Sequence, residues 1–351
     1  MKSKMKFQPV SHSWVALHPQ PKGVIQFIGG AFFGTFVPML FYRYLLKTLF
    51  EQQYTIIILP FNFTFNHYEE AGFLIREQYE IIPEIVRRSK FLGYNYQTYL
   101  NDTNFSWIGH SIGCKYISLL EGFTALPTEP EELEKFIRQL VLETSNTSNQ
   151  QKNEHKIKSI FTDLELLIND IQQKREKTIQ LVKYYLNQDI DSQILVSDAP
   201  KVTIKSIFIK GQASILLAPV NTGLESAIKP KFLAELIKKI GFDVKPTPKE
   251  TYALIKDSNL FNLMAILRWK SDNIARGTCD WFINTLRKPP QDFWQELPGG
   301  HLRPLGIQIG NFVINFPDTL SIPVIESIPK RTAGFESHVI QLLKDLSIKK
   351  Q

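Results

Sequence analysis

Cysteine is scarce in this sequence, because 351 residues contain only Cys114 and Cys279. Two distant cysteines cannot build the disulfide framework of a small secreted domain, and they are not spaced as a C-x-x-C metal-ligand pair. Residues 1–17 are basic but lack the apolar stretch and the small-residue cleavage site of a secretory signal. We therefore expect a cytoplasmic protein that begins at residue 1 and has no metal site.

The sequence also lacks a segment dominated by charge of one sign. The formal net charge is +7, but Lys and Arg are spread among Asp and Glu and form no arginine-rich stripe. A mildly basic, solvated surface is a commoner cause of such a balance than an anionic partner. We therefore expect no nucleic-acid partner.

An uninterrupted membrane-spanning run is absent too. Residues 31–50 have the length of a membrane span, but they include Pro38, Arg43 and Lys47. A charge deep inside a lone span is costly. The segment therefore indicates a buried amphipathic helix and not a transmembrane one. Peripheral contact with a membrane stays open, as does the oligomeric state.

What the sequence does contain is enough apolar residues for a large core. Hydrophobic residues make up 43% of the chain, which suits one large domain or a domain with an insertion. Strand and helix patterns alternate, and residues 54–60 contain an unbroken β-branched run, typical of a strand buried on both faces. This alternation predicts an α/β fold with a mostly parallel central sheet flanked by helices. The patterns indicate strands at 23–28, 54–60 and 103–109, and helices at 36–51, 69–89 and 114–123.

The pentapeptide Gly109-His110-Ser111-Ile112-Gly113 lies between a predicted strand and a predicted helix. Strand, sharp turn and helix are the context of a G-x-S-x-G nucleophile elbow. Glycines flank the serine because the close approach of strand and helix leaves no room for side chains there. The pattern favours Ser111 as a nucleophile at a helix N-terminus. The alternative is an ordinary turn serine.

An elbow serine needs a base and an acid, which follow it in the order Ser, acid, His. Asp272 comes just after an apolar strand pattern, whereas Asp280 lies one or two helical turns further on and is the less favoured acid. His301 lies in a glycine-rich loop 29 residues beyond Asp272, which leaves room for one helix and one strand. The order therefore predicts a triad of Ser111, Asp272 and His301.

An oxyanion hole requires two backbone N–H donors. One is expected from Ile112, and the other from Gly30 or Ala31 in the loop after the first core strand. A dinucleotide motif G-x-G-x-x-G would need glycine at positions 29, 31 and 34, and Ala31 breaks it. We therefore expect no cofactor.

Aromatic residues follow both the oxyanion turn and the second predicted core strand. They either fill the core or line a pocket for an apolar acyl chain, and both interpretations stay open. The candidate pocket residues are Phe32, Phe33, Phe63 and His67.

Several segments, spread over residues 14–310, carry a resemblance: GVIQFIGGAFFG, LPFNFTFNHYEEA, IGHSIGCK, LLAPVNTGLESAI and LPGGHLRPLG. The chain resembles the α/β-hydrolase superfamily and, within it, an uncharacterised hydrolase-like family, a domain of unknown function found in cyanobacteria and plastids. The resemblance implies the α/β-hydrolase fold and the same candidate triad. It implies no product.

The predicted core is interrupted between the elbow helix and the later strands. A polar run at 143–156 is flanked by helical patterns, and strand-like runs resume only at 202–209 and 213–220. Such an insertion is the usual form of a cap over an active site. We expect an N-terminal half of the core at 1–126, a helical cap at 127–203, a C-terminal half at 204–316 and a tail with a helix at 317–351.

The functional expectation is a serine hydrolase that acts on an ester or thioester, with a lipid-like acyl group favoured, through an acyl-enzyme. The alternative is a hydrolase fold kept as a non-catalytic binding or scaffold protein, because fold alone does not determine function.

Overall fold

The computed structural model of the chain describes residues 3–62, 64–145, 149–187, 201–205, 207–221, 244–256, 258, 261–316 and 323–350. Its centre is an eight-stranded sheet with the strand order β1-β2-β4-β3-β5-β6-β7-β8. The strands are β1 (Gln8–Val10), β2 (Ser13–Ala16), β3 (Gly23–Ile28), β4 (Tyr54–Ile58), β5 (Phe105–His110), β6 (Ala213–Leu217), β7 (Met264–Trp269) and β8 (Trp294–Leu297).

The sheet is parallel from β4 to β8, and only β1 and β2 run antiparallel to their neighbours. Every residue of β3, β4, β5 and β6 is buried, which explains why their sequences are mostly apolar and do not alternate between polar and apolar residues. The predicted strands at 23–28, 54–60 and 103–109 are confirmed as β3, β4 and β5.

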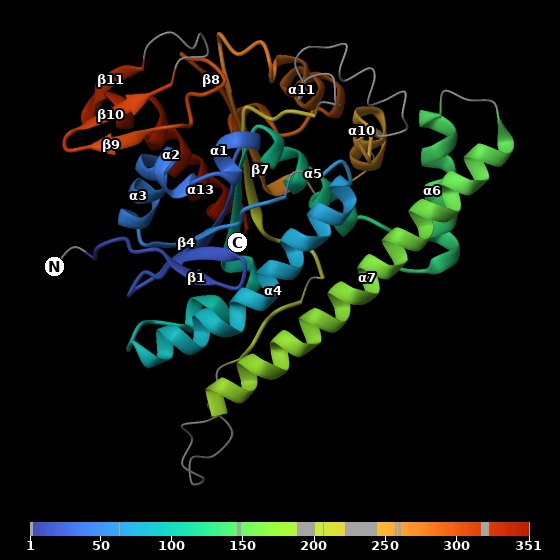
Figure 1. Ribbon diagram of the computed structural model, residues 1–351, viewed down its shortest axis with the longest axis horizontal. Coiled ribbons are helices and arrows are strands. Elements are labelled where there is room, and N and C mark those ends of the chain that lie inside the picture. The colour runs from blue at the N-terminus through green and yellow to red at the C-terminus, as the bar shows by residue number, and fades with distance from the viewer. Residues whose placement is uncertain are drawn as a thin grey trace.

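Helices lie on both sides of this sheet, with α3 and α13 on one side and α4 and α5 on the other (Figure 1). The predicted α/β fold with a mostly parallel sheet is therefore confirmed. The helices are α1 (Ala31–Thr35), α2 (Pro38–Phe41), α3 (Arg43–Glu51), α4 (His67–Phe91), α5 (Ile112–Thr124), α6 (Pro130–Thr144), α7 (Gln150–Asn187), α10 (Pro248–Lys256), α11 (Arg276–Asp280), α12 (Ile328–Arg331) and α13 (Ser337–Lys349). Short 3₁₀ turns occupy Gln97–Leu100, Asp102–Asn104, Phe261–Leu263 and Gln291–Phe293, and π turns occupy Trp281–Leu286 and Thr332–Glu336.

The apolar segment at 31–50 is partly buried, as predicted, but it is not one helix. Val37 has left-handed dihedrals, with φ 49° and ψ 50°, and Pro38 follows it. A residue before proline is disfavoured in helical geometry, so α1 ends before Val37 and α2 begins at Pro38. A second break at Tyr42, with φ −103° and ψ 13°, separates α2 from α3. Of these, α3 buries its apolar face in the core. Within the described residues, no helix combines the length and the apolar character that crossing a membrane requires.

A smaller antiparallel sheet follows the His301 loop. It is built from β9 (Ile307–Ile309), β10 (Phe312–Asn315) and β11 (Val324–Ser327). The guanidinium of Arg331 is fully buried, donates to Glu336 at 2.9 Å, and also donates to the carbonyl of Leu305 at 3.1 Å. This buried ion pair therefore fixes the chain just after His301.

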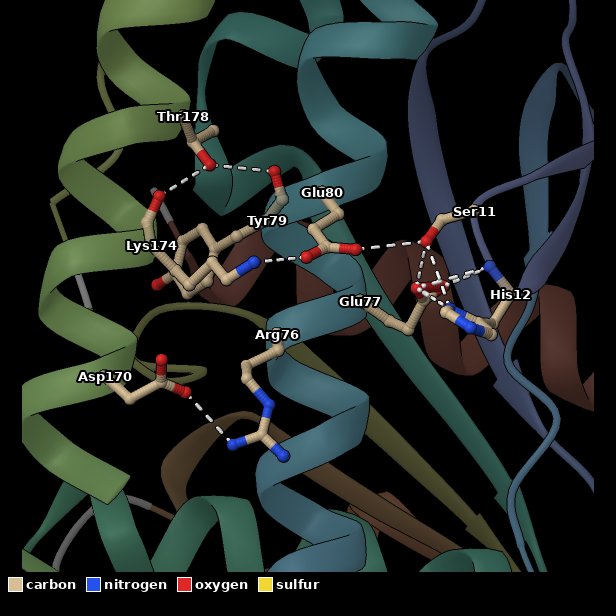
Figure 2. A network of polar contacts seen from close by, with 9 residues as sticks. All are labelled: Ser11, His12, Arg76, Glu77, Tyr79, Glu80, Asp170, Lys174 and Thr178. Carbon is tan, nitrogen blue, oxygen red and sulfur yellow. Dashed lines mark hydrogen bonds and ion pairs between the residues drawn. The ribbon is translucent and has the colours of Figure 1, made fainter. Parts of the chain in front are cut away.

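In the described residues, the insertion forms α6 and α7, and α7 packs along α4 (Figure 1). Figure 2 shows the polar part of this contact. Arg76 pairs with Asp170 at 3.0 Å, and Thr178 Oγ1 donates to the carbonyl of Tyr79 at 2.8 Å. Lys174 also pairs with Glu80. The helices rest on the flank formed by α4, and their expected role as a cap over the site stays a prediction; residues 146–148 and 188–200 lie outside the described residues.

The strand-like run at 202–209 is not a strand in the described residues. Thr203 makes only an isolated parallel bridge to Asn101, and the sheet resumes at β6. A β-branched run forms a strand only where a neighbouring strand can pair with it along its length. In the described part of this run, only Thr203 makes such a pair, with Asn101.

Candidate active site

The predicted elbow is a sharp turn between β5, which ends at His110, and α5, which begins at Ile112. Ser111 occupies the turn with φ 56° and ψ −120°, a region that is strained for any residue with a side chain. Its backbone N–H donates to the carbonyl of Leu217 at 3.0 Å, which fixes the turn against β6. The Ser111 side chain therefore lies at the carboxyl edge of the parallel strands.

The flanking glycines are required by close packing. A Cβ on Gly113 would lie 2.4 Å from the carbonyl oxygen of Ile28, and a Cβ on Gly109 would lie 2.9 Å from the backbone nitrogen of Cys114. Contacts this short with backbone atoms cannot be relieved by a side-chain rotation. The predicted reason for both glycines is confirmed.

The structure brings the three predicted residues into one hydrogen-bonded line. His301 Nε2 lies 2.9 Å from Ser111 Oγ, and His301 Nδ1 lies 2.9 Å from Asp272 Oδ2. The other carboxylate oxygen, Oδ1, accepts from the N–H groups of Ile274 at 2.9 Å and Ala275 at 3.0 Å. Both oxygens of Asp272 are therefore committed, and the carboxylate is fixed in orientation toward His301.

The electrostatics of this line favour an ionised Asp272. Burial alone would raise the pKa of its carboxyl, but the hydrogen bond and charge of His301 and the two backbone donors lower the pKa below its usual value. Asp280 lies elsewhere, half-exposed, and pairs with Arg268 at 2.8 Å. The structure thus brings Asp272, and not Asp280, to His301.

Of the three candidates for the two oxyanion donors, two have an N–H group that is free to donate to a substrate. Ile112 and Ala31 are the first residues of α5 and α1, positions whose N–H groups have no partner within a helix, and neither N–H has a partner in the described part of the chain. Gly30, in contrast, donates its N–H to the Tyr42 hydroxyl at 2.8 Å. A Cβ on Gly30 would lie 3.3 Å from the Cβ of Ser111, so this loop adjoins the serine. Of Gly30 and Ala31, the geometry favours Ala31.

Sequence reasoning missed the partners of His110. This side chain is fully buried, with Nδ1 2.7 Å from the Tyr42 hydroxyl and Nε2 2.9 Å from the carbonyl of His301. Burial, together with the neighbouring His301, lowers the pKa of His110 to about 3. Nothing in the sequence marks Tyr42, because it lies within an apolar segment that resembles core.

The aromatic pocket candidates are placed differently from one another. Phe32, next to Ala31, has 58% of its surface exposed, whereas Phe33 is half-buried against Phe41 and Phe316. Both lie on α1, beside the serine. Phe63 lies outside the described residues.

His67, the remaining candidate, is a buried histidine at the start of α4. Its ring packs edge-on against Tyr116, with the ring centroids 5.3 Å apart. Burial, helped by the charge of Lys115, lowers the pKa of His67 to about 3. The contacts of His67 are those of a core side chain and do not include Ser111 or His301.

One group of described residues has the spacing of metal ligands. Single ligand atoms of His12, Glu77 and Glu80 lie within 4.8 Å of one another. The Ser11 hydroxyl oxygen lies 2.5 Å from a carboxylate oxygen of Glu77 and 3.1 Å from one of Glu80, and Lys174 pairs with Glu80 (Figure 2). These contacts dock the β1–β2 turn onto α4 and account for the cluster.

The sheet and the site together define the class of fold. The sheet is mostly parallel, the G-x-S-x-G turn follows β5, Asp272 follows β7 and His301 follows β8. This is the α/β-hydrolase fold. Residues 6–126 match the profile of a family described as "Protein of unknown function (DUF1350)", a match that includes Ser111 but not Asp272 or His301.

The chain is also similar to solved structures of esterases. A propionate-bound esterase from Thermogutta terrifontis is 11% identical, with a TM-score of 0.37, over 85% of this chain and 83% of the other. A putative carboxylesterase from Lactobacillus plantarum is 12% identical, with a TM-score of 0.41, over 86% and 88%. An esterase B from Lactobacillus rhamnosis is 8% identical, with a TM-score of 0.42, over 96% and 82%. No curated protein matches the sequence.

Proposed function

We propose that this protein is a serine hydrolase that cleaves an ester or thioester bond. The observation that carries the proposal is the position of the His301 ring, whose two nitrogens lie 2.9 Å from Ser111 Oγ and 2.9 Å from Asp272 Oδ2. Serine is a weak nucleophile until a base takes its proton, and the imidazole is held in the right tautomer by a carboxylate.

In this mechanism Ser111 Oγ attacks the carbonyl carbon of the substrate while His301 Nε2 takes the hydroxyl proton. Asp272 stabilises the imidazolium that forms. The N–H groups of Ile112 and Ala31 donate to the oxyanion of the tetrahedral intermediate. The leaving alcohol or thiol receives the proton from His301, and a water molecule, activated by the same histidine, then hydrolyses the acyl-Ser111 ester.

The surroundings of the serine support an apolar acyl group. Beside Ala31, the segment formed by α1 and α2 exposes Phe32, Phe36, Val37 and Leu40. Val37 holds a left-handed conformation that is unfavourable for a β-branched residue, and strain of this kind concentrates at functional sites. A lipid-like acyl chain would cover this apolar surface, and binding there would keep water from the oxyanion.

The two cysteines support a location in a reducing compartment such as the cytoplasm. Cys114 and Cys279 are both buried and unpaired. A chain whose thiols remain free suits the cytoplasm, where disulfides are rare.

A fluorophosphonate probe tests the proposal directly. Wild-type protein should be labelled and should hydrolyse p-nitrophenyl esters, whereas Ser111→Ala should lose labelling and roughly 10⁴- to 10⁶-fold of the rate. Ser118→Ala is the matched control, because Ser118 lies on the same helix and donates to the carbonyl of Cys114 at 2.8 Å. It should keep labelling and rate.

The opposite outcomes have definite meanings. Hydrolysis by Ser111→Ala at the wild-type rate would refute the nucleophile. A folded wild-type protein that is neither labelled nor active on any ester of a chain-length series would favour the non-catalytic binding protein. A rate that increases from acetate to dodecanoate supports the apolar acyl site.

A further inference from the structure

A chain of three hydrogen bonds runs between the two loops that flank Ser111. The N–H of Gly30 lies 2.8 Å from the Tyr42 hydroxyl, and that hydroxyl lies 2.7 Å from His110 Nδ1. On the other side of the ring, His110 Nε2 lies 2.9 Å from the carbonyl oxygen of His301. Gly30 precedes the proposed oxyanion donor Ala31, and His301 is the proposed base.

The direction of every bond in this chain is determined by its two ends. The carbonyl of His301 can only accept, so His110 Nε2 must carry the proton. In the neutral ring Nδ1 is then an acceptor, and the Tyr42 hydroxyl must donate to it. The N–H of Gly30 can only donate, and the hydroxyl oxygen of Tyr42 accepts from it. One proton arrangement therefore satisfies all four groups.

Burial keeps this arrangement from reversing. Tyr42 and His110 are both fully buried. Burial lowers the pKa of His110 to about 3 and raises the pKa of Tyr42 above its usual value. A neutral histidine has one donor and one acceptor, whereas a protonated one has two donors and would turn an N–H toward the Tyr42 hydroxyl. At neutral pH the chain has only the arrangement described.

We propose that Tyr42 and His110 are positioning residues that set the distance between the oxyanion loop and the histidine loop. The inference rests on the proposed function. His110 is next to Ser111 in the chain, and a Cβ on Gly30 would lie 3.0 Å from His110 Nδ1. The pair thus ties together the loop after β3, the turn after β5 and the loop after β8, which carry Ala31, Ser111 and His301.

A purely packing role would not need these polar groups. Apolar rings of similar size would fill the same volume without the cost of burying a hydroxyl and an imidazole. Once buried, each group must be paired, and loss of one partner leaves the other unsatisfied. The pair therefore adds directional restraint on two backbone groups, which packing alone does not supply.

The first test is Tyr42→Phe, which removes one oxygen and leaves the ring. We expect kcat for a p-nitrophenyl ester to fall by about 10- to 100-fold, with KM changed less than about 3-fold. The loss of the bond to Gly30 displaces the neighbouring N–H of Ala31, which acts on the transition state more than on the bound substrate. The inhibition constant of an alkylboronic acid, which forms a tetrahedral adduct, should rise by a similar factor. Tyr99→Phe is the control, since the fully buried Tyr99 hydroxyl lies 2.7 Å from Thr55 Oγ1. It should leave kcat and the boronate affinity unchanged.

The second test compares His110→Gln with His110→Leu. Glutamine retains one donor and one acceptor, and leucine retains neither, so Gln should keep more of kcat at equal thermal stability. Tyr42→Phe combined with His110→Leu should lose little more than His110→Leu alone, because the two residues act in one chain. Wild-type kcat in folded Tyr42→Phe, or losses that simply multiply in the double variant, would overturn the proposal.

A third measurement does not depend on activity. The nitrogen-15 spectrum of the imidazoles in the wild-type protein should show His110 neutral and protonated at Nε2 at pH 7, with Nδ1 shifted in Tyr42→Phe. A proton on Nδ1 would refute the chain of hydrogen bonds even if the protein is an active hydrolase. Conversely, an inactive protein with the Nε2 tautomer would refute the proposed function and leave the bonded pair intact.

Discussion

Asp272 and His301 are 29 residues apart in the sequence and meet through a hydrogen bond of 2.9 Å between Oδ2 and Nδ1. The second carboxylate oxygen accepts from two backbone N–H groups in the turn after β7, so the carboxylate cannot rotate away. The turn that orients Asp272 thereby orients the imidazole as well. Asp272 can therefore be distinguished from the other nearby acid, Asp280, by the effect of replacing each one.

Asp272→Asn should therefore lower kcat by about 10⁴-fold, because the amide can hold the ring in the wrong tautomer. Asp280→Asn is the matched control, since the half-exposed Asp280 pairs with Arg268 and not with His301 among the described residues. It should stay within about 2-fold of wild type, as surface pairs contribute little. Steady-state hydrolysis of p-nitrophenyl acetate measures both. Equal losses in the two variants would show that the acid has been misassigned.

Gly113→Ala should destabilise the protein strongly. The added Cβ would lie 2.4 Å from one backbone carbonyl oxygen, that of Ile28, and 2.8 Å from the next, so the elbow must open or β3 must move. We expect a loss of about 3 kcal/mol or more, in the range of severe overpacking. Gly277→Ala is the control because a Cβ there meets nothing within 4 Å and the residue is helical. It should be neutral or stabilising by about 0.5–1 kcal/mol.

Denaturant midpoints of the two glycine variants decide the matter. A Gly113→Ala protein as stable as wild type would mean that the strand and the helix approach less closely than the structure indicates. A strongly destabilised Gly277→Ala protein would mean that α11 does not tolerate a methyl group at position 277.

The elbow could be predicted from the sequence because its determinants are local. A buried strand run, two glycines around Ser111 and a helix pattern all lie within residues 103–123. The acid and the histidine were predictable because the order of the chain places Asp272 and His301 after successive strands of one sheet. Parallel strands bring their carboxyl ends to one edge, so residues distant in sequence become neighbours there.

Other features depend on contacts that no local pattern contains. The bond between Gly30 and the Tyr42 hydroxyl joins a loop to a residue in an apolar segment, and hydrophobic periodicity cannot distinguish a tyrosine that packs from one that also donates. The break between α1 and α2 follows from the left-handed Val37 before Pro38. In the sequence, Pro38 counted only as evidence against a membrane span, and nothing marked Val37. The docking of α7 on α4 could not be predicted either, because the apolar face of an amphipathic helix shows that the helix packs but not which helix it packs against.

Stability should fall on acidification, in part because of His67. The folded pKa of His67 is about 3, against 6.5 for the free side chain, so between these pH values the unfolded chain binds a proton that the native chain does not. Stability is therefore lost as pH falls below about 6.5, by at most about 1.4 kcal/mol per pH unit for this group. His67→Phe removes the titrating group and keeps a ring against Tyr116.

Urea unfolding at pH 7 and pH 5 measures this contribution. The loss of unfolding free energy between the two pH values should be smaller in His67→Phe by up to about 2 kcal/mol. Between pH 7 and pH 8 the two proteins should show the same pH dependence, which serves as the internal control. An identical loss at pH 5 in both proteins would mean that His67 is not buried as a neutral ring.

The junction of α6 and α7 should be the first site of proteolysis, and its release should change access to Ser111. Lys152 is exposed in the first turn of α7, whereas Lys174 is paired with Glu80 on α4. Lys156 pairs with Glu250 of α10, which precedes β7, so the junction is tied to the segment that leads to Asp272. Early tryptic cuts at Lys152 should leave the core intact and raise activity toward dodecanoate esters more than toward acetate, because the cut insertion no longer restricts entry of large substrates.

The control variant is Lys152→Gln, which removes the cleavage site but not the helix. It should delay both the cut and the change in selectivity. Cuts that appear first within 23–60 or 260–300 would show that the core opens before the insertion. An unchanged ratio of the two activities after cleavage at Lys152 would mean that α6 and α7 brace α4 and do not cover the site.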